Sequence, residues 1–253
     1  MTDSSTPSQP LISVVVPVKD EVENVAPLIH EIAAALAPGM AFEIVYVDDG
    51  STDGTTEALA ALRVEVPELS VYRHARCCGQ SAGVATGVRR AKAPLIATLD
   101  GDGQNDPADI PALVERWRAE GGDDQVLIAG WRQKRKDTGI RRLSSKIANG
   151  IRSNLLRDET PDTGCGLKVF TRQAFLDMPR FDHMHRFLPA LMIRQGGRVV
   201  SVPVNHRPRE RGASKYGVWN RLWVGIVDLF GVRWLIRRGS VPVVTALGNG
   251  SEP

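Results

Sequence analysis

Two carboxylates stand one residue apart in the segment TLDGDGQND, residues 98–106, directly after a short apolar run. Asp100 and Asp102 therefore follow what we predict to be a buried strand, and a tight turn can point both side chains at one spot. The glycines that flank Asp102 permit such a turn, and Gln104 adds a neutral oxygen. Oxygen ligands of this kind suit Mg²⁺ or Mn²⁺ held together with substrate phosphates. A solvated acidic loop closed by Asx turns is the alternative, and spacing alone does not separate the two.

Acidic side chains also follow two other apolar runs. Asp49 lies in the segment DDGS that comes after the run 42–47, and Glu21 comes shortly after the run 12–16 and Pro17. Asp49 could accept hydrogen bonds from a nucleobase or a ribose, or it could cap a helix. Glu21 has the same two interpretations, and the sequence leaves both open.

The elements that must position these residues alternate between strand and helix. We predict strands at 12–16, 42–47, 69–73, 94–99 and 125–130, and helices at 24–37, from a cap at Thr52 or Asp53 to Arg63, at 81–92 and at 107–120. Such alternation predicts right-handed βαβ crossovers and a parallel sheet. Because ligands of such sheets bind at the carboxyl ends of the strands, the acidic groups should meet at one edge.

The remaining chain is less regular and more basic. We predict a basic helix at 138–156, a strand at 166–170, a helix at 184–195, a strand at 199–204 and a basic loop at 205–217. In terms of domains, 1–10 is expected to be disordered, 11–217 to be the main domain, 218–238 an amphipathic helical segment and 239–253 a flexible tail. Local basic clusters of this kind attract phosphates, nucleic acid or an anionic membrane.

Composition limits the class of protein. The chain has 253 residues, 42% hydrophobic and 24% charged, which is typical of one soluble α/β domain with a small appendage. Three cysteines, two of them adjacent, form a poor disulfide framework and indicate a reducing compartment. The polar start resembles no signal peptide, and no uncharged apolar run reaches the roughly 18 residues that would span a bilayer. We therefore expect a cytoplasmic protein.

Seven short segments together resemble a known family. The segments are VVVPVKDEVEN (14–24), VDDGSTDGT (47–55), GQSAGVATG (79–87), LDGDGQNDP (99–107), DTGCGLKVF (162–170), HRFLPAL (185–191) and RERGASKYG (209–217). In this order they resemble the family 2 inverting glycosyltransferases, most of all the dolichyl-phosphate mannose synthases and bacterial polyprenyl-phosphate glycosyltransferases. The resemblance runs from about residue 12 to residue 238. It implies the GT-A fold, a Rossmann-like α/β fold with a mainly parallel central sheet flanked by helices.

The resemblance also implies roles for particular residues. The nucleotide sugar would be held by Pro17, Lys19, Glu21, Asp49, Gly79, Gln80, Asp100, Gly101, Asp102, Gln104, Lys168, Arg209 and Lys215. A divalent metal, Mg²⁺ or Mn²⁺, would be bound by Asp100, Asp102 and Gln104, and the acceptor phosphate by Arg132, Arg141 and Ser145. The catalytic candidates are Asp102, Arg132, Arg209 and Lys215, with Asp162 as a further candidate for which a structural role is the alternative.

The implied chemistry agrees with these residue types. When a sugar leaves a nucleoside diphosphate, negative charge develops on the leaving group, and a cation with Arg or Lys stabilises it. An acceptor phosphate is already ionised at pH 7, so it needs positioning rather than a base. We therefore predict transfer of a hexose with inversion, mannose from GDP-mannose, to a polyprenyl or dolichyl phosphate. The alternatives are a UDP-sugar transferase acting on undecaprenyl phosphate and a nucleotide-sugar-binding module without turnover.

Such an acceptor lies in a membrane, which raises the question of how the chain reaches it. The segment WNRLWVGIVDLFGVRWLIRR, 219–238, combines tryptophans, aliphatic residues and arginines, as interfacial helices do. We expect peripheral association with the cytoplasmic face of a membrane, with core packing of this helix as the alternative and a membrane-protein partner as another route. A nucleic-acid partner is not expected, because no nucleic-acid-binding motif is present.

The segments differ from the usual family pattern in three places. Lys19 and Asp20 precede the glutamate where other residues are common, which leaves the nucleotide open. Cys77 and Cys78 precede GQSAG where asparagine is common, and the acidic segment has small glycines that could loosen it. His185 has packing at a helix start and a functional role as open alternatives.

Overall fold

The computed structural model describes residues 10–132, 152–153, 155–156, 158–209 and 218–242, with the side chains of the last segment described from residue 225 onward. Its strands are β1 Ile12–Val18, β2 Phe42–Asp48, β3 Leu69–Arg73, β4 Leu95–Thr98, β5 Val126–Trp131, β6 Lys168–Thr171 and β7 Arg198–Pro203. Its helices are α1 Val22–Leu36, α2 Thr55–Glu65, α3 Gln80–Arg90, α4 Ile110–Ala119, α6 Arg172–Leu176, α7 Leu188–Arg194 and α8 Val218–Arg237, with 3₁₀ turns η1 Pro107–Asp109 and η2 Met184–Arg186.

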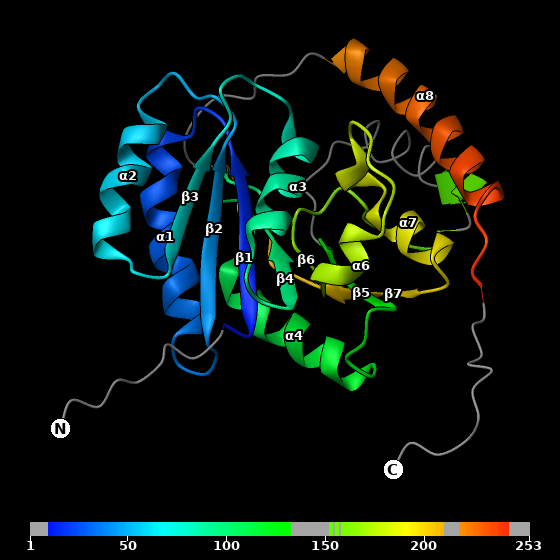
Figure 1. Cartoon of the computed structure of the whole chain (residues 1–253), viewed down its shortest axis with the longest axis horizontal. Coiled ribbons are helices and arrows are strands. Elements are labelled where there is room, and N and C mark those ends of the chain that lie inside the picture. The colour runs from blue at the N-terminus through cyan, green and yellow to red at the C-terminus, as the bar shows by residue number, and fades with distance from the viewer. Residues whose placement is uncertain (1–9, 133–151, 154, 157, 210–217, 243–253) are drawn as a thin grey trace, which may run out of the picture.

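The strands of the described residues form one sheet in the order β3-β2-β1-β4-β6-β5-β7. β1 pairs in parallel with β2 and β4, and β5 pairs in parallel with β7. Every residue of β1 is buried, as expected for a central strand covered on both faces. The predicted α/β architecture with a mainly parallel sheet is therefore confirmed (Figure 1).

β6 is the exception, because it runs antiparallel to both of its neighbours, β4 and β5. The chain leaves β5 at one edge of the sheet and re-enters from that same edge, so β6 must point the other way. Its first residue, Lys168, consequently pairs with Thr98, the last residue of β4. A residue at the start of a strand thus reaches the edge at which the parallel strands end.

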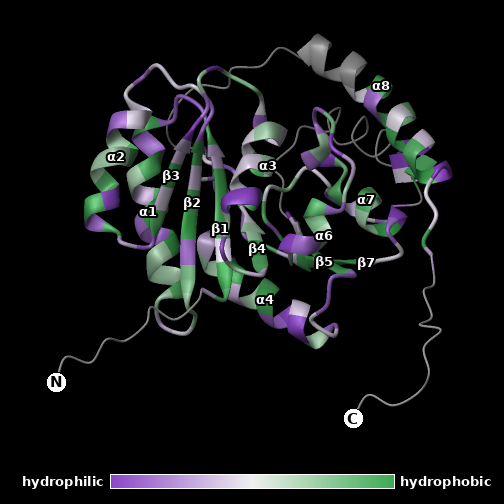
Figure 2. Cartoon of the chain, in the orientation of Figure 1, coloured by the Kyte–Doolittle hydropathy of each residue, from purple (hydrophilic) through white to green (hydrophobic). Residues whose placement is uncertain are grey.

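Two hydrophobic layers enclose the sheet. Alternate residues of β1, among them Val14 and Val16, pack with α1, α2 and α4 in one cluster. Val15, from the opposite face of β1, packs with α3, α6 and α7 in the other. The central strands are accordingly coloured hydrophobic in Figure 2. This two-sided burial fixes the strand ends, and with them the site.

The helix α8 lies along the outside of α7 (Figure 1). Val232 is buried in the second cluster, against which Leu229, Leu235 and Ile236 also pack. Val227, Phe230 and Trp234 are 58–62% exposed. At 100° per residue these two sets fall on opposite sides of the helix. The described part of α8 is thus apolar on two sides, one packed on the protein and one exposed. No helix among the described residues is long and apolar enough to span a membrane.

Several predicted boundaries need correction. The N-cap of α2 is Gly54, not Thr52 or Asp53, although the Asp53 carboxylate accepts the Thr55 N–H at 3.0 Å. The short helix α6 was not predicted; Thr171 caps it by accepting the Ala174 N–H at 3.2 Å. The predicted basic helix at 138–156 lies largely outside the described residues.

Candidate active site

A cavity of about 640 Å³ opens where β1, β2 and β4 end and β6 begins. Most of the predicted donor-site residues line it. They are Pro17, Lys19, Glu21, Asp49, Gln80, Asp100, Gly101, Asp102, Gln104, Lys168 and Arg209. These side chains therefore lie together at one edge of the sheet, as we expected from the sequence.

The other predicted residues lie elsewhere. Gly79 is the N-cap of α3, next to the cavity-lining Gln80. Arg132 and Asp162 contact each other beside the cavity-lining Gly164. Arg141, Ser145 and Lys215 fall outside the described residues.

The turn after β4 carries the paired carboxylates. Gln80 Nε2 donates to Asp100 Oδ1 at 2.7 Å, and the Gln104 N–H donates to Asp102 Oδ1 at 3.2 Å. A Cβ on Gly101 would lie 2.3 Å from Val18 Cγ1, so the glycine lets the turn pack directly on β1. Gly101 therefore allows the close approach of this turn to β1.

The electrostatics of this turn suit a cation. Burial raises the pKa of Asp100, and the neighbouring negative charge of Asp102 raises it further. Two carboxylates that resist ionising together are stabilised by a divalent ion, and hard carboxylate and amide oxygens are its preferred donors. The residues present therefore fit Mg²⁺ or Mn²⁺.

Lys168 approaches the same point from β6. Its side chain is buried, and Nζ donates to the carbonyls of Cys165 and of Thr163, the latter at 3.3 Å. Burial lowers its pKa, while the negative charge of Asp100 opposes this. A buried ammonium facing the acidic turn is placed to interact with a phosphate bound there.

Asp49 has a structural role that the sequence left open. Its carboxylate accepts the N–H groups of Cys78 at 2.7 Å and Gly79 at 2.8 Å, so it holds the start of α3. Burial alone would raise the pKa of Asp49, but hydrogen bonds, that from His74 foremost, lower it. The turn before α2 depends instead on Asp48, whose carboxylate accepts the Ser51 N–H at 2.8 Å. Asp49 also lines the cavity, so capping and ligand contact are compatible.

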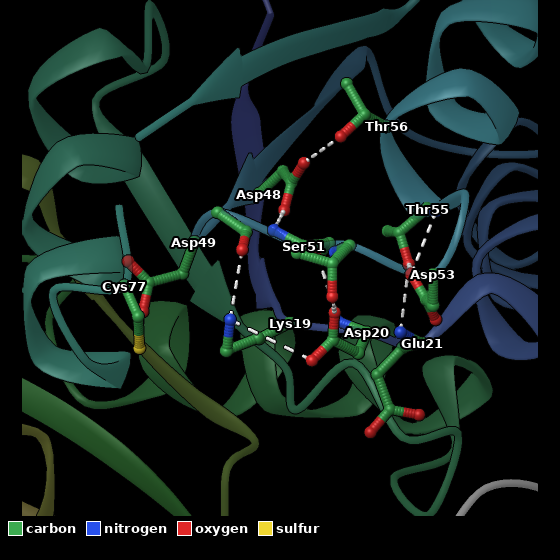
Figure 3. Close-up of polar contacts among 12 residues, drawn as sticks. Lys19, Asp20, Glu21, Asp48, Asp49, Ser51, Asp53, Thr55, Thr56 and Cys77 are labelled. Atoms are coloured by element: carbon green, nitrogen blue, oxygen red, sulfur yellow. Dashed lines mark hydrogen bonds and ion pairs between the residues drawn. The ribbon is translucent and has the colours of Figure 1, made fainter. Parts of the chain in front are cut away.

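The ends of β1 and β2 are tied together (Figure 3). Lys19 Nζ donates to the Gly50 carbonyl at 3.0 Å, and the Asp20 N–H donates to Ser51 Oγ at 2.8 Å. These bonds join segments about thirty residues apart in sequence. The cavity wall formed by the two loops is therefore fixed before any ligand binds.

Arg209 reaches over the cavity from the segment after β7. Its Nη2 lies 2.5 Å from Glu21 Oε1, and its Nη1 lies 3.9 Å from Asp102 Oδ2. The guanidinium thus connects the β1 loop with the acidic turn across a sequence separation of 188 residues. It brings positive charge to the place where a diphosphate would meet the carboxylates.

Arg132 and Asp162 form a bidentate pair. Nε lies 2.6 Å from Oδ2 and Nη2 lies 2.8 Å from Oδ1, with side-chain exposures of 12% and 8%. Such a fork is the strongest arrangement available to an arginine and a carboxylate. The geometry favours a positioning role for Asp162, which orients the guanidinium.

The predicted site did not include two basic residues that line the cavity, His185 and Arg186. His185 shares a 2.7 Å contact between Nδ1 and Ser81 Oγ, and burial, followed by the charges of Arg186 and Lys168, lowers its pKa to about 3. Arg186 also lines the cavity. Both residues lie in the segment HRFLPAL, and the resemblance of this segment to the family was the sequence signal that could have identified them.

Comparisons with known proteins relate the chain to one family. Residues 13–178 match the family described as Glycosyl transferase family 2. The chain is 36% identical over 236 residues to a dodecaprenyl-phosphate galacturonate synthase of Rhizobium johnstonii, covering 91% of this chain and 69% of the relative. It is 36% identical over 210 residues to an undecaprenyl-phosphate 4-deoxy-4-formamido-L-arabinose transferase of Edwardsiella ictaluri, covering 82% and 63%. The chain thus spans about two thirds of the length of these relatives.

Solved structures share the fold. A mannosyltransferase from Pyrobaculum calidifontis in complex with GDP-Man and Mn²⁺ has a TM-score of 0.65 at 19% identity, covering 93% of this chain and 67% of that one. A glucosyl-3-phosphoglycerate synthase from Mycobacterium tuberculosis in complex with Mn²⁺, UDP-glucose and glycerol 3-phosphate has a TM-score of 0.58 at 16% identity, covering 92% and 82%. Together with the family match, these likenesses show that the chain belongs to glycosyl transferase family 2 and has the GT-A fold.

Proposed function

We propose that this chain transfers a sugar from a nucleoside diphosphate sugar to a polyprenyl phosphate, with inversion at the sugar carbon. The observation that carries the proposal is the convergence of Asp100, Asp102, Lys168 and Arg209 on one cavity at the carboxyl edge of the sheet. A departing nucleoside diphosphate requires positive charge around it. Here the carboxylates would hold a metal cation, and the Lys and Arg side chains would contact the diphosphate directly.

The donor side follows from the described contacts. Lys168 and Arg209 stabilise the charge that develops on the diphosphate as the bond to the sugar breaks. Asp100, Asp102 and Gln104 would hold Mg²⁺ or Mn²⁺, which when bound neutralises diphosphate charge. Lys19 and Glu21 shape the wall for the nucleoside. Because Arg209 bridges Glu21 and Asp102, we expect its segment to help retain the donor.

The acceptor side depends on the region after β5. Arg132, oriented by Asp162, is placed next to the cavity and would bind the acceptor phosphate. Arg141 and Ser145 are proposed for the same phosphate, and Lys215 for the donor phosphates, on the resemblance alone. A phosphate oxygen held against the sugar carbon needs no general base, because it is already ionised.

The relatives bear on which sugar and lipid are used. Their names specify galacturonate and 4-deoxy-4-formamido-L-arabinose on dodecaprenyl and undecaprenyl phosphate. These names support a bacterial-type polyprenyl phosphate over dolichyl phosphate, and they give no support to mannose. GDP-mannose remains one donor to test, beside the UDP-sugar alternative.

We further propose that α8 contacts the membrane that holds the acceptor, at its cytoplasmic face. Val227, Phe230 and Trp234 are exposed on one side while Val232 anchors the opposite side to the protein. Arg237 and Arg238 at the end of the helix suit anionic headgroups. A triple Val227→Ser, Phe230→Ser, Trp234→Ser variant should lose flotation with anionic vesicles. Val64→Ser, a control that alters an apolar residue 86% exposed elsewhere on the protein, should float like the wild-type chain. Equal flotation of the wild-type chain, the control and the triple variant would refute the contact.

Transfer of labelled sugar into an organic-extractable lipid tests the function. The purified chain is given undecaprenyl phosphate in detergent with GDP-mannose, UDP-glucose, UDP-GlcNAc or UDP-galacturonate, in Mg²⁺, Mn²⁺ or EDTA. Metal-dependent label in the lipid from one donor establishes the reaction and the donor together. If no donor labels the lipid, the proposal that a polyprenyl phosphate is the acceptor is refuted.

Matched variants tie the reaction to the site. Asp102→Asn should lower turnover by at least about 100-fold, since it removes charge at the point of transition-state stabilisation. Asp124→Asn, an exposed carboxylate elsewhere, should leave turnover unchanged. Normal turnover of Asp102→Asn in saturating Mg²⁺ would refute the metal assignment. A binding module without turnover would instead bind the nucleotide by calorimetry in both proteins and transfer no sugar.

A further inference from the structure

We propose that Asp49, His74 and Cys78 form a second metal site, for a zinc-like divalent cation, distinct from the acidic turn after β4. One carboxylate oxygen, one imidazole nitrogen and one sulfur from these residues all lie within 4.8 Å of one another. Carboxylate, imidazole and thiolate together are the ligand set that Zn²⁺ prefers, whereas Mg²⁺ and Mn²⁺ prefer oxygen alone. The two sites would therefore select different metals.

The position of the three ligands suits a cation arriving from solvent. Asp49 is buried, His74 is half-buried and Cys78 is exposed, so the site opens outward from the start of α3. Cys78 belongs to the pair of cysteines at which this sequence differs from the usual family pattern.

The imidazole of His74 contacts a carboxylate at one nitrogen and a hydroxyl at the other. Its Nδ1 lies 2.7 Å from Asp49 Oδ1, and its Nε2 lies 2.9 Å from Thr86 Oγ1. In the free chain Nδ1 donates this hydrogen bond to Asp49, so binding a cation at Nδ1 requires the other tautomer, in which Nε2 carries the proton and donates it to the Thr86 hydroxyl. A partner at the second nitrogen is the arrangement that fixes histidine ligands in metalloproteins.

Binding changes the protonation of one group. The Cys78 thiol, which lies 3.3 Å from the Arg76 carbonyl, loses its proton to solvent as its sulfur binds the cation. Asp49 and neutral His74 supply the second and third ligands, and water takes the fourth position. The Cys77 thiol faces the other oxygen of Asp49 at 3.2 Å and stays outside the ligand set; Figure 3 draws these two residues together.

The site would regulate the neighbouring cavity, an effect that rests on the proposed function. Asp49 lines the cavity, and its carboxylate also holds the Cys78 and Gly79 N–H groups. A cation drawn to that carboxylate alters both the charge available to a nucleotide and the start of α3. Zn²⁺ should therefore weaken nucleotide binding while Mg²⁺ is kept constant.

Titration with Co²⁺, a spectroscopic substitute for Zn²⁺, tests the site without any assay of activity. A cobalt–thiolate bond absorbs in the near ultraviolet, and the oxygen-only turn after β4 cannot produce that band. The wild-type chain and Cys77→Ser should show the band, and Zn²⁺ should abolish it. Cys78→Ser should show none, with Zn²⁺ affinity reduced by more than about 100-fold, and Thr86→Val should weaken binding about tenfold.

The outcomes separate the two proposals. No band in the wild-type chain, or a band kept in Cys78→Ser and lost in Cys77→Ser, overturns the metal site; circular dichroism confirms that each variant is folded. Calorimetry of GDP and UDP binding with and without Zn²⁺ then tests the effect on the cavity. If the cobalt band appears and neither nucleotide binds under any condition, the metal site stands and the proposed function fails.

Discussion

The pair formed by Arg132 and Asp162 allows a quantitative test of how the acceptor side is built. Asp162→Asn keeps the shape of the side chain and removes its charge, so the guanidinium of Arg132, which is only 12% exposed, loses its bidentate counterion. Two unit charges about 4 Å apart interact by about 4 kcal/mol at an effective dielectric constant of 20. Breaking a buried pair on one side costs about 3–5 kcal/mol.

The asparagine still accepts one hydrogen bond, so we expect the free energy of unfolding to fall by about 2–3 kcal/mol. Urea unfolding followed by circular dichroism measures this. With a slope of about 3 kcal/mol per molar urea, the midpoint should fall by about 1 M.

A double-mutant cycle isolates the pair from other contacts. Arg132→Met should also destabilise the fold, because it removes the bidentate partner of the buried Asp162 carboxylate. The double variant should be less destabilised than the sum of the two single variants, with a coupling of about 2 kcal/mol. Additive effects, or a midpoint shift below about 0.2 M for Asp162→Asn, would refute the reasoning that these two side chains stabilise each other.

Three further predictions concern the cavity. Lys168→Met removes a buried charge whose described hydrogen bonds go only to backbone carbonyls. The midpoint of urea unfolding should therefore stay the same or rise, while the rate of sugar transfer should fall by about 100-fold or more. A lower midpoint together with a normal transfer rate would contradict this prediction. Gly166→Ala would place a Cβ 2.3 Å from the Asp100 carboxylate. We therefore expect the free energy of unfolding to fall by about 1–3 kcal/mol and sugar transfer to depend less on Mn²⁺. If both quantities are unchanged, Asp100 moves freely and the reasoning is wrong. In the unfolded chain His185 is protonated as the pH falls through 6.5, whereas in the folded chain it stays neutral down to about pH 3. The free energy of unfolding of the wild-type chain should therefore fall as the pH is lowered between these values, and that of His185→Gln should fall less steeply. Urea midpoints of the two proteins that run parallel from pH 7 to pH 5 would refute this prediction.

Much of the donor side could be predicted because its signals are local. β1, β2 and β4 are short β-branched or apolar runs followed at once by turn residues, and parallel strands bring their ends to one edge. Asp100 and Asp102 needed only that rule to be placed together. The two helical layers follow in the same way from apolar periodicity.

The remaining features depend on contacts that no local pattern encodes. The direction of β6 is set by the path of the chain after β5 and not by its four residues. Arg209 meets Glu21 across 188 residues, and Arg132 meets Asp162 across 30. Asp49 was predicted to cap a helix or bind a ligand, but the helix it caps is α3 rather than the adjacent α2. Tertiary packing selects among such partners.

The reversed direction of β6 has a consequence for how enzymes of this kind could diversify. Because β5 ends and β6 begins at the same edge, everything between Trp131 and Lys168 is an excursion that departs from and returns to the rim of the sheet. The last part of this excursion is constrained, because Leu156 and Cys165 are buried and residues 163–166 line the cavity. We therefore expect that exchanging only residues 133–151 for the corresponding stretch of a relative would leave the pairing of β4 with β6 and the buried end of the excursion as they are, so that this part of the chain can vary separately from the sheet.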